Sequence, residues 1–513
     1  FIHRANDVNH LMVNRILRPT LALLMAAGLS GPASAQRDGG AAPAASASVR
    51  APTRRASLTR RLNALLDEPP FDRAIWGVAI ADPSGRIVYA RNADRLFIPA
   101  SVAKILVASA AAALLPPDYR YRTSVYAAGL VDSGVVRGDL ALYGRGDPTL
   151  SGRFYDSVSV AFDEMADALR ARGIVRVTGD VVGDASYFDS VLVHPSWAGY
   201  DLNWWYAAPV TALGFNENSV DFTITPTMPG SPPAISFAPD LGVVRFTNHA
   251  RTVPADSVRT IDFYRAPGTN TIWAAGDVPA DVRAWTEHVA VWDAPAWAAA
   301  ALRRSLEQHG IVVDGRALTT FDSAVYAAAR RGAPLAEHQS VPLPDVLRPI
   351  LESSQNWFAD LLLKTLGREF RGVGSFAAGI EVERRFLIDS LAVDSTAFEV
   401  VDGSGLSAGN LATPRAFVQI LRAMRRRPGA EAFVQALPVG GHSGTLQYRF
   451  RNPPLEGRVR AKTGSIDRVN TLAGYLELDG GRTWTFAIQL NHHTATNRDA
   501  LRRIDAVVAE LAR

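Results

Sequence analysis

The sequence contains no cysteine, few lysines and no long apolar run beyond its first residues. The absence of cysteine excludes a thiol nucleophile, a thiolate metal site and any disulfide, so the fold depends on its core. After the N-terminal region, no stretch is long and apolar enough for a membrane helix. The net charge is +4, without a basic stripe interleaved with aromatics, which argues against nucleic-acid binding. The hydrophobic share of 48% and the charged share of 20% are those of a globular protein.

Lysine is the scarcest of the charged residue types. The chain has 54 lysines and arginines, and only Lys104, Lys364 and Lys462 are lysines. Most surface positions accept either cation, so we expect a retained lysine where arginine cannot serve. A desolvated lysine can give up its proton and act as a base, whereas arginine keeps its charge. Two of the three lie in Ser101-Val102-Ala103-Lys104 and Lys462-Thr463-Gly464-Ser465, a pairing that indicates a serine acyl-transfer site with a lysine base.

The first residues have the pattern of an export signal. Met12 to Arg18 is basic, Leu21 to Leu29 is a short apolar core, and Ala33-Ser34-Ala35 is a small-residue cleavage site. We therefore expect residues 1–35 to be a signal peptide with Met12 as its true start, which predicts export to the periplasm. An uncleaved N-terminal anchor is the alternative, and association with the membrane or the cell wall stays open. Residues 36–55 are rich in Ala, Ser, Gly, Pro and Arg and predict a flexible leader.

The remaining pattern predicts an α/β body that is split in two by a β-rich block. Near the start, two strands flank a turn, and a helix follows that Pro116 ends. Residues 118–335 hold many short strand-like runs, and helices return from about residue 337. The chain then closes with a hairpin and a helix. The expected elements are a helix capped by Ser57 and running to Leu66, strands 76–81 and 87–90, the helix 101–115, strands 125–130, 140–143, 175–182, 221–224 and 242–246, helices 344–351 and 357–366, strands 459–462, 472–478 and 483–490, and the helix 500–511.

Three motifs carry the candidate chemistry. Ser101 and Lys104 are three positions apart at the start of a helix, so hydroxyl and amine can meet on one face. The N-terminal end of that helix adds backbone N–H groups and a positive dipole end, which favour a developing oxyanion. In Ser354-Gln355-Asn356, the hydroxyl of Ser354 can relay a proton to a leaving amine. Asn356 can hold Lys104 by its carbonyl and the substrate by its amide. A simple helix cap is the other interpretation of this tripeptide.

The third motif lies in the predicted strand that carries Lys462. An edge strand beside the nucleophile can bind an extended peptide through main-chain hydrogen bonds. We expect Lys462 and Thr463 to engage a terminal carboxylate and Gly464 to leave room for close approach. The N–H of Ser465 is expected to complete an oxyanion hole with that of Ser101. Burial, together with the nearby Lys462, is expected to lower the pKa of Lys104.

The three motifs, in this order and with a long gap before the second, resemble those of penicillin-binding proteins and serine β-lactamases. The long gap is similar to one branch, the D-alanyl-D-alanine carboxypeptidase/endopeptidases of the penicillin-binding protein 4 type, peptidase family S13. Further stretches share the resemblance, among them Gly144 to Leu150, Tyr206 to Leu213, Phe215 to Asn218 and Asp402 to Ser407. The likeness implies an antiparallel sheet flanked by helices, with inserted β-rich domains. It also implies cleavage of D-Ala-D-Ala ends or cross-links of peptidoglycan, covalent inhibition by β-lactams at Ser101, and no cofactor or metal.

On this resemblance we expect residues 56–123 and 337–513 to form the D,D-peptidase domain. Residues 124–149 and 224–336 are expected to form an inserted β-rich domain, and residues 150–223 a further inserted domain. Gln355 departs from the family, in which many members carry aspartate. A serine β-lactamase or esterase of the same fold, or an inactive cell-wall-binding protein, are the alternatives. The sequence does not choose carboxypeptidase over endopeptidase, and it leaves the stem-peptide diamino acid and the oligomeric state open.

Four other features have simpler interpretations. Gly441 to Thr445 resembles a hydrolase nucleophile elbow without its last glycine, and we interpret it as a turn. His492 and His493 point apart and predict a polar loop. Asp402 with Ser404 is either a loop that supports the site or a plain turn. The aromatic group Trp197, Trp204, Trp205 and Tyr206 is expected to pack in the core or at a domain interface more readily than to hold glycan.

Overall fold

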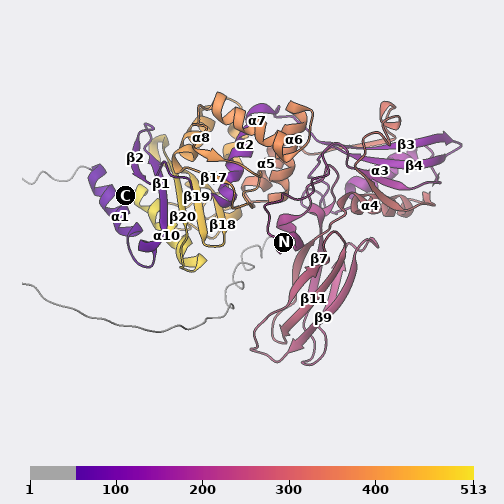
Figure 1. Ribbon diagram of the computed structural model, residues 1–513, viewed down its shortest axis with the longest axis horizontal. Helices are drawn as coiled ribbons and strands as arrows, with labels where there is room; N and C mark the ends of the chain where they lie inside the picture. Colours follow the sequence, from indigo (N-terminus) through magenta and orange to yellow (C-terminus); the bar gives the residue numbers. More distant parts are fainter. Residues whose placement is uncertain (1–53) are drawn as a thin grey trace, which may run out of the picture. The chain divides into compact units, whose positions relative to one another are not determined.

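The computed structural model describes residues 54–513, and Figure 1 shows them coloured along the chain. The predictions for the signal peptide, its alternative anchor and nearly all of the leader fall on residues 1–53 and lie outside the described residues. Within residues 54–513, no helix has both the length and the apolar character needed to cross a membrane.

The central sheet is built from the two ends of the described chain. Its order is β18-β19-β20-β1-β2, and every neighbouring pair is antiparallel. Figure 1 shows the late strands β19 and β20 beside the early strand β1. The strands are β1 (Ile75–Ala81), β2 (Ile87–Arg91), β18 (Val459–Ile466), β19 (Val469–Leu478) and β20 (Arg482–Asn491). The predicted split body is therefore confirmed, and β18 lies at one edge of the sheet.

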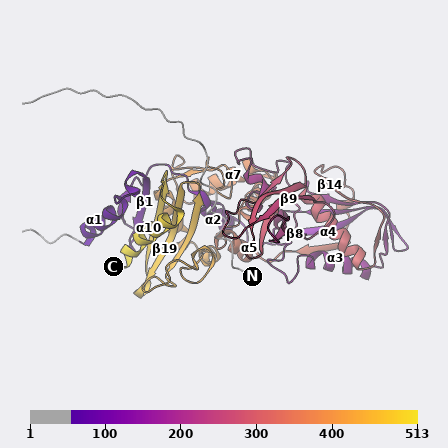
Figure 2. The same ribbon diagram turned by 90° about the horizontal axis from the view of Figure 1, so that it is seen from below.

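Alternating residues of β1 serve two different hydrophobic layers. Val78 and Ile80 belong to the cluster that contains the helices α1 (Arg54–Leu66) and α10 (Asn497–Ala509), both of which are labelled in Figure 2. Ala79 and Ala81 belong to the larger cluster on the other face, because successive strand side chains point to opposite faces. Small side chains there allow helices to pack closely. These helices are α2 (Lys104–Leu114), α5 (Leu343–Leu351), α6 (Asn356–Arg371), α7 (Phe376–Arg385), α8 (Pro414–Arg426) and α9 (Glu431–Gln435).

The start of α1 differs from the prediction. Ser57 was expected to cap the helix, but α1 already includes Arg54. The hydroxyl of Ser57 instead accepts a hydrogen bond of 2.6 Å from Arg61, one turn later on the same face. A serine within the first turns of a helix and a serine at its cap leave similar sequence signals, because both precede the apolar stripe.

Residues 122–339 form the strand-rich part. A seven-stranded sheet contains β3 (Arg122–Asp132), β4 (Val135–Gly144), β5 (Arg176–Val177), β6 (Val181–Asp184), β13 (Val312–Val313), β14 (Ala317–Thr320) and β15 (Ala336–Gln339), with the helices α3 (Val160–Ala171) and α4 (Ala294–Gln308). The single strand expected over 175–182 is two strands, β5 and β6. Asp139 Oδ1 accepts the N–H of Asp180 at the break between them. The chain enters this part at β3 and leaves it at β15, and these two strands pair.

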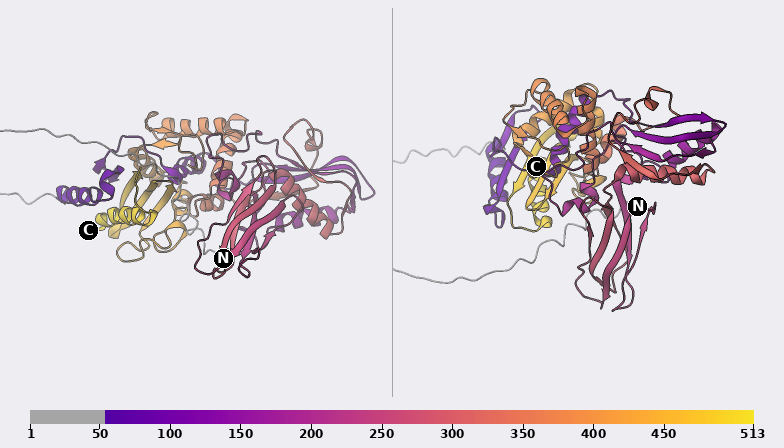
Figure 3. Two further views of the ribbon diagram at one scale, coloured as in Figure 1. Left: turned by 60° about the horizontal axis from the view of Figure 1, so that its bottom comes forward. Right: turned by 45° about the vertical axis from the view of Figure 1, so that its right-hand side comes forward.

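Two three-stranded sheets complete the strand-rich part, with orders β12-β7-β8 and β10-β11-β9. Figure 3 shows the chain from two further directions. Their strands are β7 (Ser219–Thr225), β8 (Ala234–Ala238), β9 (Arg245–Val253), β10 (Asp262–Arg265), β11 (Thr271–Pro279) and β12 (Trp285–Ala290). Phe222 of the first sheet contacts Phe246 and Phe263 of the second, with ring centroids 4.8 and 5.0 Å apart. Aromatic packing therefore joins the two sheets. The division into a peptidase domain and two inserted domains, with the boundaries given above, stays a prediction.

Candidate active site

Ser101 and Lys104 belong to a tight turn that leads into α2. Residues Ala100–Ala103 form a 3₁₀ turn, and α2 begins at Lys104. In a 3₁₀ turn, residues three apart are nearly eclipsed, so the two side chains lie on the same side. Lys104 Nζ is 2.9 Å from Ser101 Oγ. The spacing of the first motif therefore brings hydroxyl and amine together.

Lys104 has no exposed surface, and three oxygens surround its amine. Besides Ser101 Oγ, the amine donates to Asn356 Oδ1 at 2.7 Å and to the Ser404 carbonyl at 2.6 Å. Burial lowers the pKa of Lys104 to about 7, although the negative charges of Asp360 and Asp402 oppose the shift. Near neutral pH, a substantial fraction of Lys104 is therefore the free amine that a general base requires.

Lys462 supplies a second buried amine from the edge strand β18. Its Nζ donates to Ser354 Oγ and to the Thr463 carbonyl, both at 2.8 Å. Burial holds the pKa of Lys462 well below its ordinary value, and repulsion from Lys104 lowers it further. The repulsion between the two lysines, which was expected to lower the pKa of Lys104, therefore lowers the pKa of Lys462. The lowered pKa of Lys104 itself is caused by burial.

Ser354 has a left-handed backbone with φ of 63°. Such a conformation is uncommon for a residue other than glycine, and it is found where surrounding structure enforces it. Ser354 comes just before Gln355, the N-cap of α6. Its hydroxyl thus reaches Lys462 while Asn356, two residues later, reaches Lys104. The two serines, Ser101 and Ser354, are partly exposed, whereas both lysines are fully buried.

Close packing joins β18 to the Ser101 turn. A Cβ on Gly464 would lie 2.3 Å from Thr471 Oγ1, 2.7 Å from the Pro99 carbonyl and 3.0 Å from the Ser101 nitrogen. Only glycine permits this approach, so Gly464 allows the edge strand to lie against the nucleophile turn itself. Next to it, Ser465 Oγ accepts a hydrogen bond of 2.8 Å from Asn470.

Thr463 meets Thr445, a residue that the sequence analysis placed in a turn without giving it a role at the site. Its hydroxyl donates to Thr445 Oγ1 at 2.8 Å, and the N–H of Thr445 donates to the Glu352 carbonyl. Thr445 ends the segment that resembles a nucleophile elbow. Ser443 in that segment accepts the N–H of Val439, as a turn residue does. The turn therefore brings a hydroxyl to the site without supplying a nucleophile.

Asp360 is a second residue that the motifs did not reveal. It follows Asn356 by one helical turn on α6, and it is fully buried. Its Oδ1 accepts the N–H groups of Gly403 at 2.8 Å and Ser404 at 3.1 Å. The carbonyl of Ser404 is the one that contacts Lys104, so the loop at Asp402 supports the site rather than forming a plain turn. A four-residue spacing from Asn356 was the available sequence signal.

The third lysine, Lys364, is also fully buried but lies outside the three motifs. Its Nζ donates to Asp189 Oδ1 at 2.8 Å and to the carbonyls of Val191 and Val210 at 2.7 and 3.1 Å. Burial lowers the pKa of Lys364, and the charge of Asp189 opposes that shift. Lys364 thus connects α6 to the segment around residues 189–210.

The remaining sequence features are accounted for by packing and polar contacts. Gln355 is buried and donates to the carboxylate of Glu217. His493 Nε2 lies 2.8 Å from Asn470 Oδ1, in line with the polar loop that was expected. Trp197 and Trp204 are buried, and Trp204 packs edge-on against Phe263. The predicted packing role of the aromatic group holds for these two.

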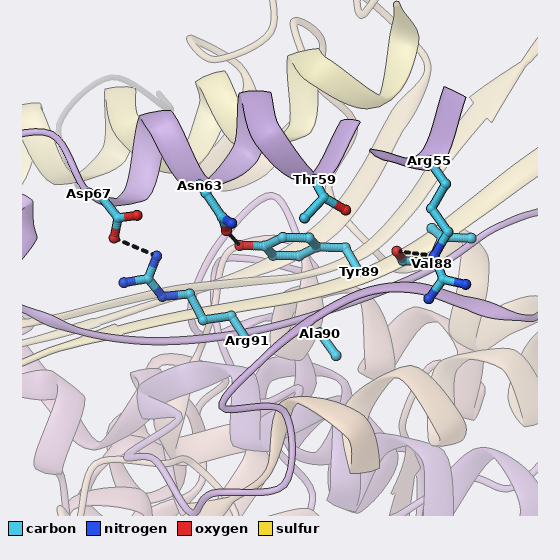
Figure 4. A pocket seen from close by; sticks show the side chains of 8 residues that line it. All are labelled: Arg55, Thr59, Asn63, Asp67, Val88, Tyr89, Ala90 and Arg91. Atoms are coloured by element: carbon cyan, nitrogen blue, oxygen red, sulfur yellow. Dashed lines mark hydrogen bonds and ion pairs between the residues drawn. The ribbon is translucent and has the colours of Figure 1, made fainter. Parts of the chain in front are cut away.

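One pocket of the described residues lies away from Ser101. This pocket of about 520 Å³ lies between α1 and β2. Strand β2 is at the opposite edge of the sheet from β18. As Figure 4 shows, its polar side chains satisfy one another: Asp67 pairs with Arg91, and Tyr89 donates to Asn63. Helix α1 therefore covers the outer edge strand, which protects it from pairing with other chains.

Comparison with known proteins identifies the class of this fold. Penicillin-binding protein 4 (dacB) from Haemophilus influenzae superposes with a TM-score of 0.78 at 24% identity, covering 88% of this chain and 99% of that chain. Its complex with a β-lactam superposes with a TM-score of 0.74 at 23% identity, covering 88% of this chain and 99% of that one. The chain therefore has a penicillin-binding-protein fold, which confirms the predicted fold class.

Sequence comparison then defines the family. The model of the D-Ala-D-Ala carboxypeptidase 3 (S13) family matches residues 58–511. A D-alanyl-D-alanine carboxypeptidase of Actinomadura sp. strain R39 is 33% identical over 467 residues, or 89% of this chain and 84% of the relative. The carboxypeptidase DacB of Haemophilus influenzae is 25% identical over 421 residues, or 80% of this chain and 83% of the relative. The chain belongs to the S13 family, as the resemblance of its motifs predicted.

Proposed function

We propose that this chain is a serine D,D-peptidase that cleaves D-Ala-D-Ala bonds of peptidoglycan stem peptides through an acyl-enzyme on Ser101. The observation that carries the proposal is the geometry of Lys104. In the free amine, two N–H groups donate to Asn356 Oδ1 and to the Ser404 carbonyl. The lone pair is then left for the hydroxyl of Ser101, 2.9 Å away, which is the arrangement of a general base and its nucleophile.

In the acylation step, the proton of Ser101 passes to Lys104 while Ser101 Oγ attacks the carbonyl of the penultimate D-Ala. The backbone N–H groups of Ser101 and Ser465 are the proposed oxyanion donors, because β18 lies against the Ser101 turn at Gly464. Ser354 then gives a proton to the nitrogen of the leaving D-Ala. The ammonium form of Lys462, whose Nζ is 2.8 Å from the hydroxyl, replaces the proton that Ser354 gives up, which leaves Lys462 as the free amine. Water then attacks the acyl-enzyme, its proton returns through Ser354 to Lys462, and Ser101 leaves as the alkoxide and takes its proton back from Lys104.

Substrate binding is proposed to use the edge strand β18. An extended peptide can pair with the outer side of this strand beyond Ala461, because residues 438–440 already bond to Val459 and Ala461 there. Lys462 and Thr463 are the proposed partners of the terminal carboxylate, and binding an anion beside Lys462 would favour its charged form. Asn356 already donates one amide N–H to the Tyr206 carbonyl at 2.8 Å. Its second N–H is the proposed donor to the substrate amide.

The proposed substrate predicts where the enzyme acts and which compounds inhibit it. Peptidoglycan lies outside the cytoplasmic membrane, which fits export to the periplasm. A β-lactam presents a strained amide and a carboxylate to the same groups, so we propose covalent inhibition at Ser101. The β-lactam complex of the Haemophilus influenzae protein, which shares this fold, agrees with that proposal.

The test is intact-mass spectrometry of the purified chain after incubation with benzylpenicillin, beside Ser101→Ala. We expect one penicilloyl adduct on Ser101, none on the variant, and release of D-alanine from a peptide that ends in D-Ala-D-Ala. Rapid penicillin hydrolysis without an adduct would instead indicate a β-lactamase. The absence of both an adduct and penicillin hydrolysis would refute the catalytic assignment.

A further inference from the structure

A segment that lies far from the motifs in sequence contacts the groups that surround Lys104. We define it as the 189–210 segment, which lies in the strand-rich part of the chain. The indole Nε1 of Trp197 donates to Asp402 Oδ2 at 2.9 Å. Ser196 Oγ donates to Ser407 Oγ at 2.7 Å. Further along, the Tyr206 carbonyl accepts the amide of Asn356 at 2.8 Å. These contacts reach both of the groups that hold the Lys104 amine, which are Asn356 and the loop that contains Ser404.

The loop that contains Ser404 is held by two buried carboxylates. Asp360 accepts the N–H groups of Gly403 and Ser404 from the side of α6. Asp402 accepts the N–H of Gly405 at 2.7 Å through Oδ1 and that of Ser407 at 2.8 Å through Oδ2. The side chain of Asp402 therefore folds the loop around itself.

Asp402 in turn is held in place by its own donors. Asn410 Nδ2 donates to Oδ1 at 2.8 Å, and Trp197 donates to Oδ2. Asp402 is 1% exposed, so water does not replace a missing donor. Hydrogen bonds to a buried carboxylate are charge-assisted and stronger than those between neutral groups. The indole of Trp197 is the donor that comes from outside the loop and its flanking residues.

The orientation of Lys104 depends on where this loop lies. The free amine has two N–H groups, and its lone pair points along the remaining tetrahedral direction. Asn356 Oδ1 and the Ser404 carbonyl take the two N–H groups only if both oxygens stay within hydrogen-bond distance. A displaced Ser404 carbonyl would let the amine rotate, and the lone pair would no longer face Ser101. Small displacements of this kind reduce catalytic rates strongly.

We propose that Trp197 is a positioning residue for the general base, and that it acts through Asp402 and the Ser404 carbonyl on the orientation of Lys104. The inference rests on the proposed function of Lys104. It gives the 189–210 segment a part in catalysis that the three motifs do not contain. The segment therefore helps to orient the Lys104 amine, in addition to enclosing the site.

The titratable groups that face Lys104 come from three elements. Asp360 lies on α6, Asp402 on the loop, and Lys462 on β18. The charge of Asp402 favours the ammonium form of Lys104. Replacing Asp402 by asparagine would therefore move the acidic limb of the rate profile to lower pH, because the base would lose its proton more easily. A role confined to packing would leave that limb in place.

The test compares Trp197→Phe with Trp297→Phe as a matched control. Trp297 is a fully buried tryptophan of α4, and its indole N–H has no hydrogen-bond partner among residues 54–513. Both variants lose the same atoms from a buried site, but only the first loses a hydrogen bond to a carboxylate. We expect Trp197→Phe to slow acylation of Ser101 by benzylpenicillin about ten-fold. Trp297→Phe should acylate at the wild-type rate even though its melting temperature falls.

Asp402→Asn is the second variant, in case Trp197→Phe does not fold. It keeps the shape of the side chain, and we expect a lower plateau rate together with an acidic limb at lower pH. Equal plateau rates for Trp197→Phe and Trp297→Phe, or an unmoved limb in Asp402→Asn, would overturn the inference. A wild-type chain that forms no adduct on Ser101 would overturn the proposed function as well. If the wild-type chain is acylated on Ser101 but the variants show none of the expected changes, only the positioning role of Trp197 is overturned.

Discussion

The pH dependence of Ser101 acylation follows directly from the burial of Lys104. Burial lowers the pKa of this amine from 10.5 to about 7. One pH unit below that value, about one molecule in eleven carries the free amine, and one unit above it about ten in eleven do. If the free amine is the base, the second-order rate of acylation should rise about ten-fold between about pH 6 and about pH 8 and then level off.

A fluorescent penicillin, quenched at short times across this pH range, measures that rate. Lys104→Arg supplies the internal control, because a guanidinium keeps its proton throughout the range. Its rate should fall by about 10²- to 10⁴-fold, the usual contribution of a general base, and should show no limb. Circular dichroism at each pH confirms that the fold is intact. A wild-type rate that keeps rising to about pH 10 would mean that Lys104 titrates normally, and a flat profile would refute the lysine base.

Three further predictions test separate parts of the site. Ser354→Ala removes the oxygen that Lys462 contacts, and single-turnover acylation should slow by about 10²-fold or more with the melting temperature nearly unchanged. Lys364→Met leaves Asp189 and two carbonyls without their donor. The free energy of unfolding should drop by about 3 kcal/mol in denaturant titration, while acylation per folded molecule stays at the wild-type rate. Thr445→Val removes the acceptor of the Thr463 hydroxyl, so KM for a D-Ala-D-Ala peptide should change several-fold with little effect on kcat, and a change in kcat alone would contradict this role.

The sequence predicts the nucleophile and its base because their relation is local. A three-residue spacing at a helix start is enough to bring Ser101 beside Lys104. The contact between Ser354 and Lys462 depends on the fold, and the sequence predicted only that both residues belong to one site. The split body was predicted from the pattern of elements along the chain, and the pairing of β1 with β20 joins its two parts although these strands are far apart in sequence.

Other parts of the site leave no comparable sequence signal. The acceptors at Ser404 and Tyr206 are backbone carbonyls, which every residue possesses. Asp360 is an ordinary helical aspartate until the fold places the N–H groups of a distant loop beside it. Thr445 lies in a turn that resembles a different motif. The early start of α1 and the break between β5 and β6 were missed for a related reason, since element ends are decided by hydrogen bonds to other segments.

The scarcity of lysine predicts that the retained lysines are buried, but the motifs are needed to predict which of them are catalytic. All three lysines have no exposed surface, although only Lys104 and Lys462 lie at the site. Lys364 shows why burial alone can retain a lysine: its ammonium directs three donors at Asp189 and two backbone carbonyls. A planar guanidinium presents five donors in a rigid fork and cannot satisfy that small tetrahedral set. At Lys104 the same compact shape has a second consequence, because the buried amine can lose one proton and keep two donors engaged. A single physical property of lysine therefore serves a structural role at one position and a catalytic role at the other.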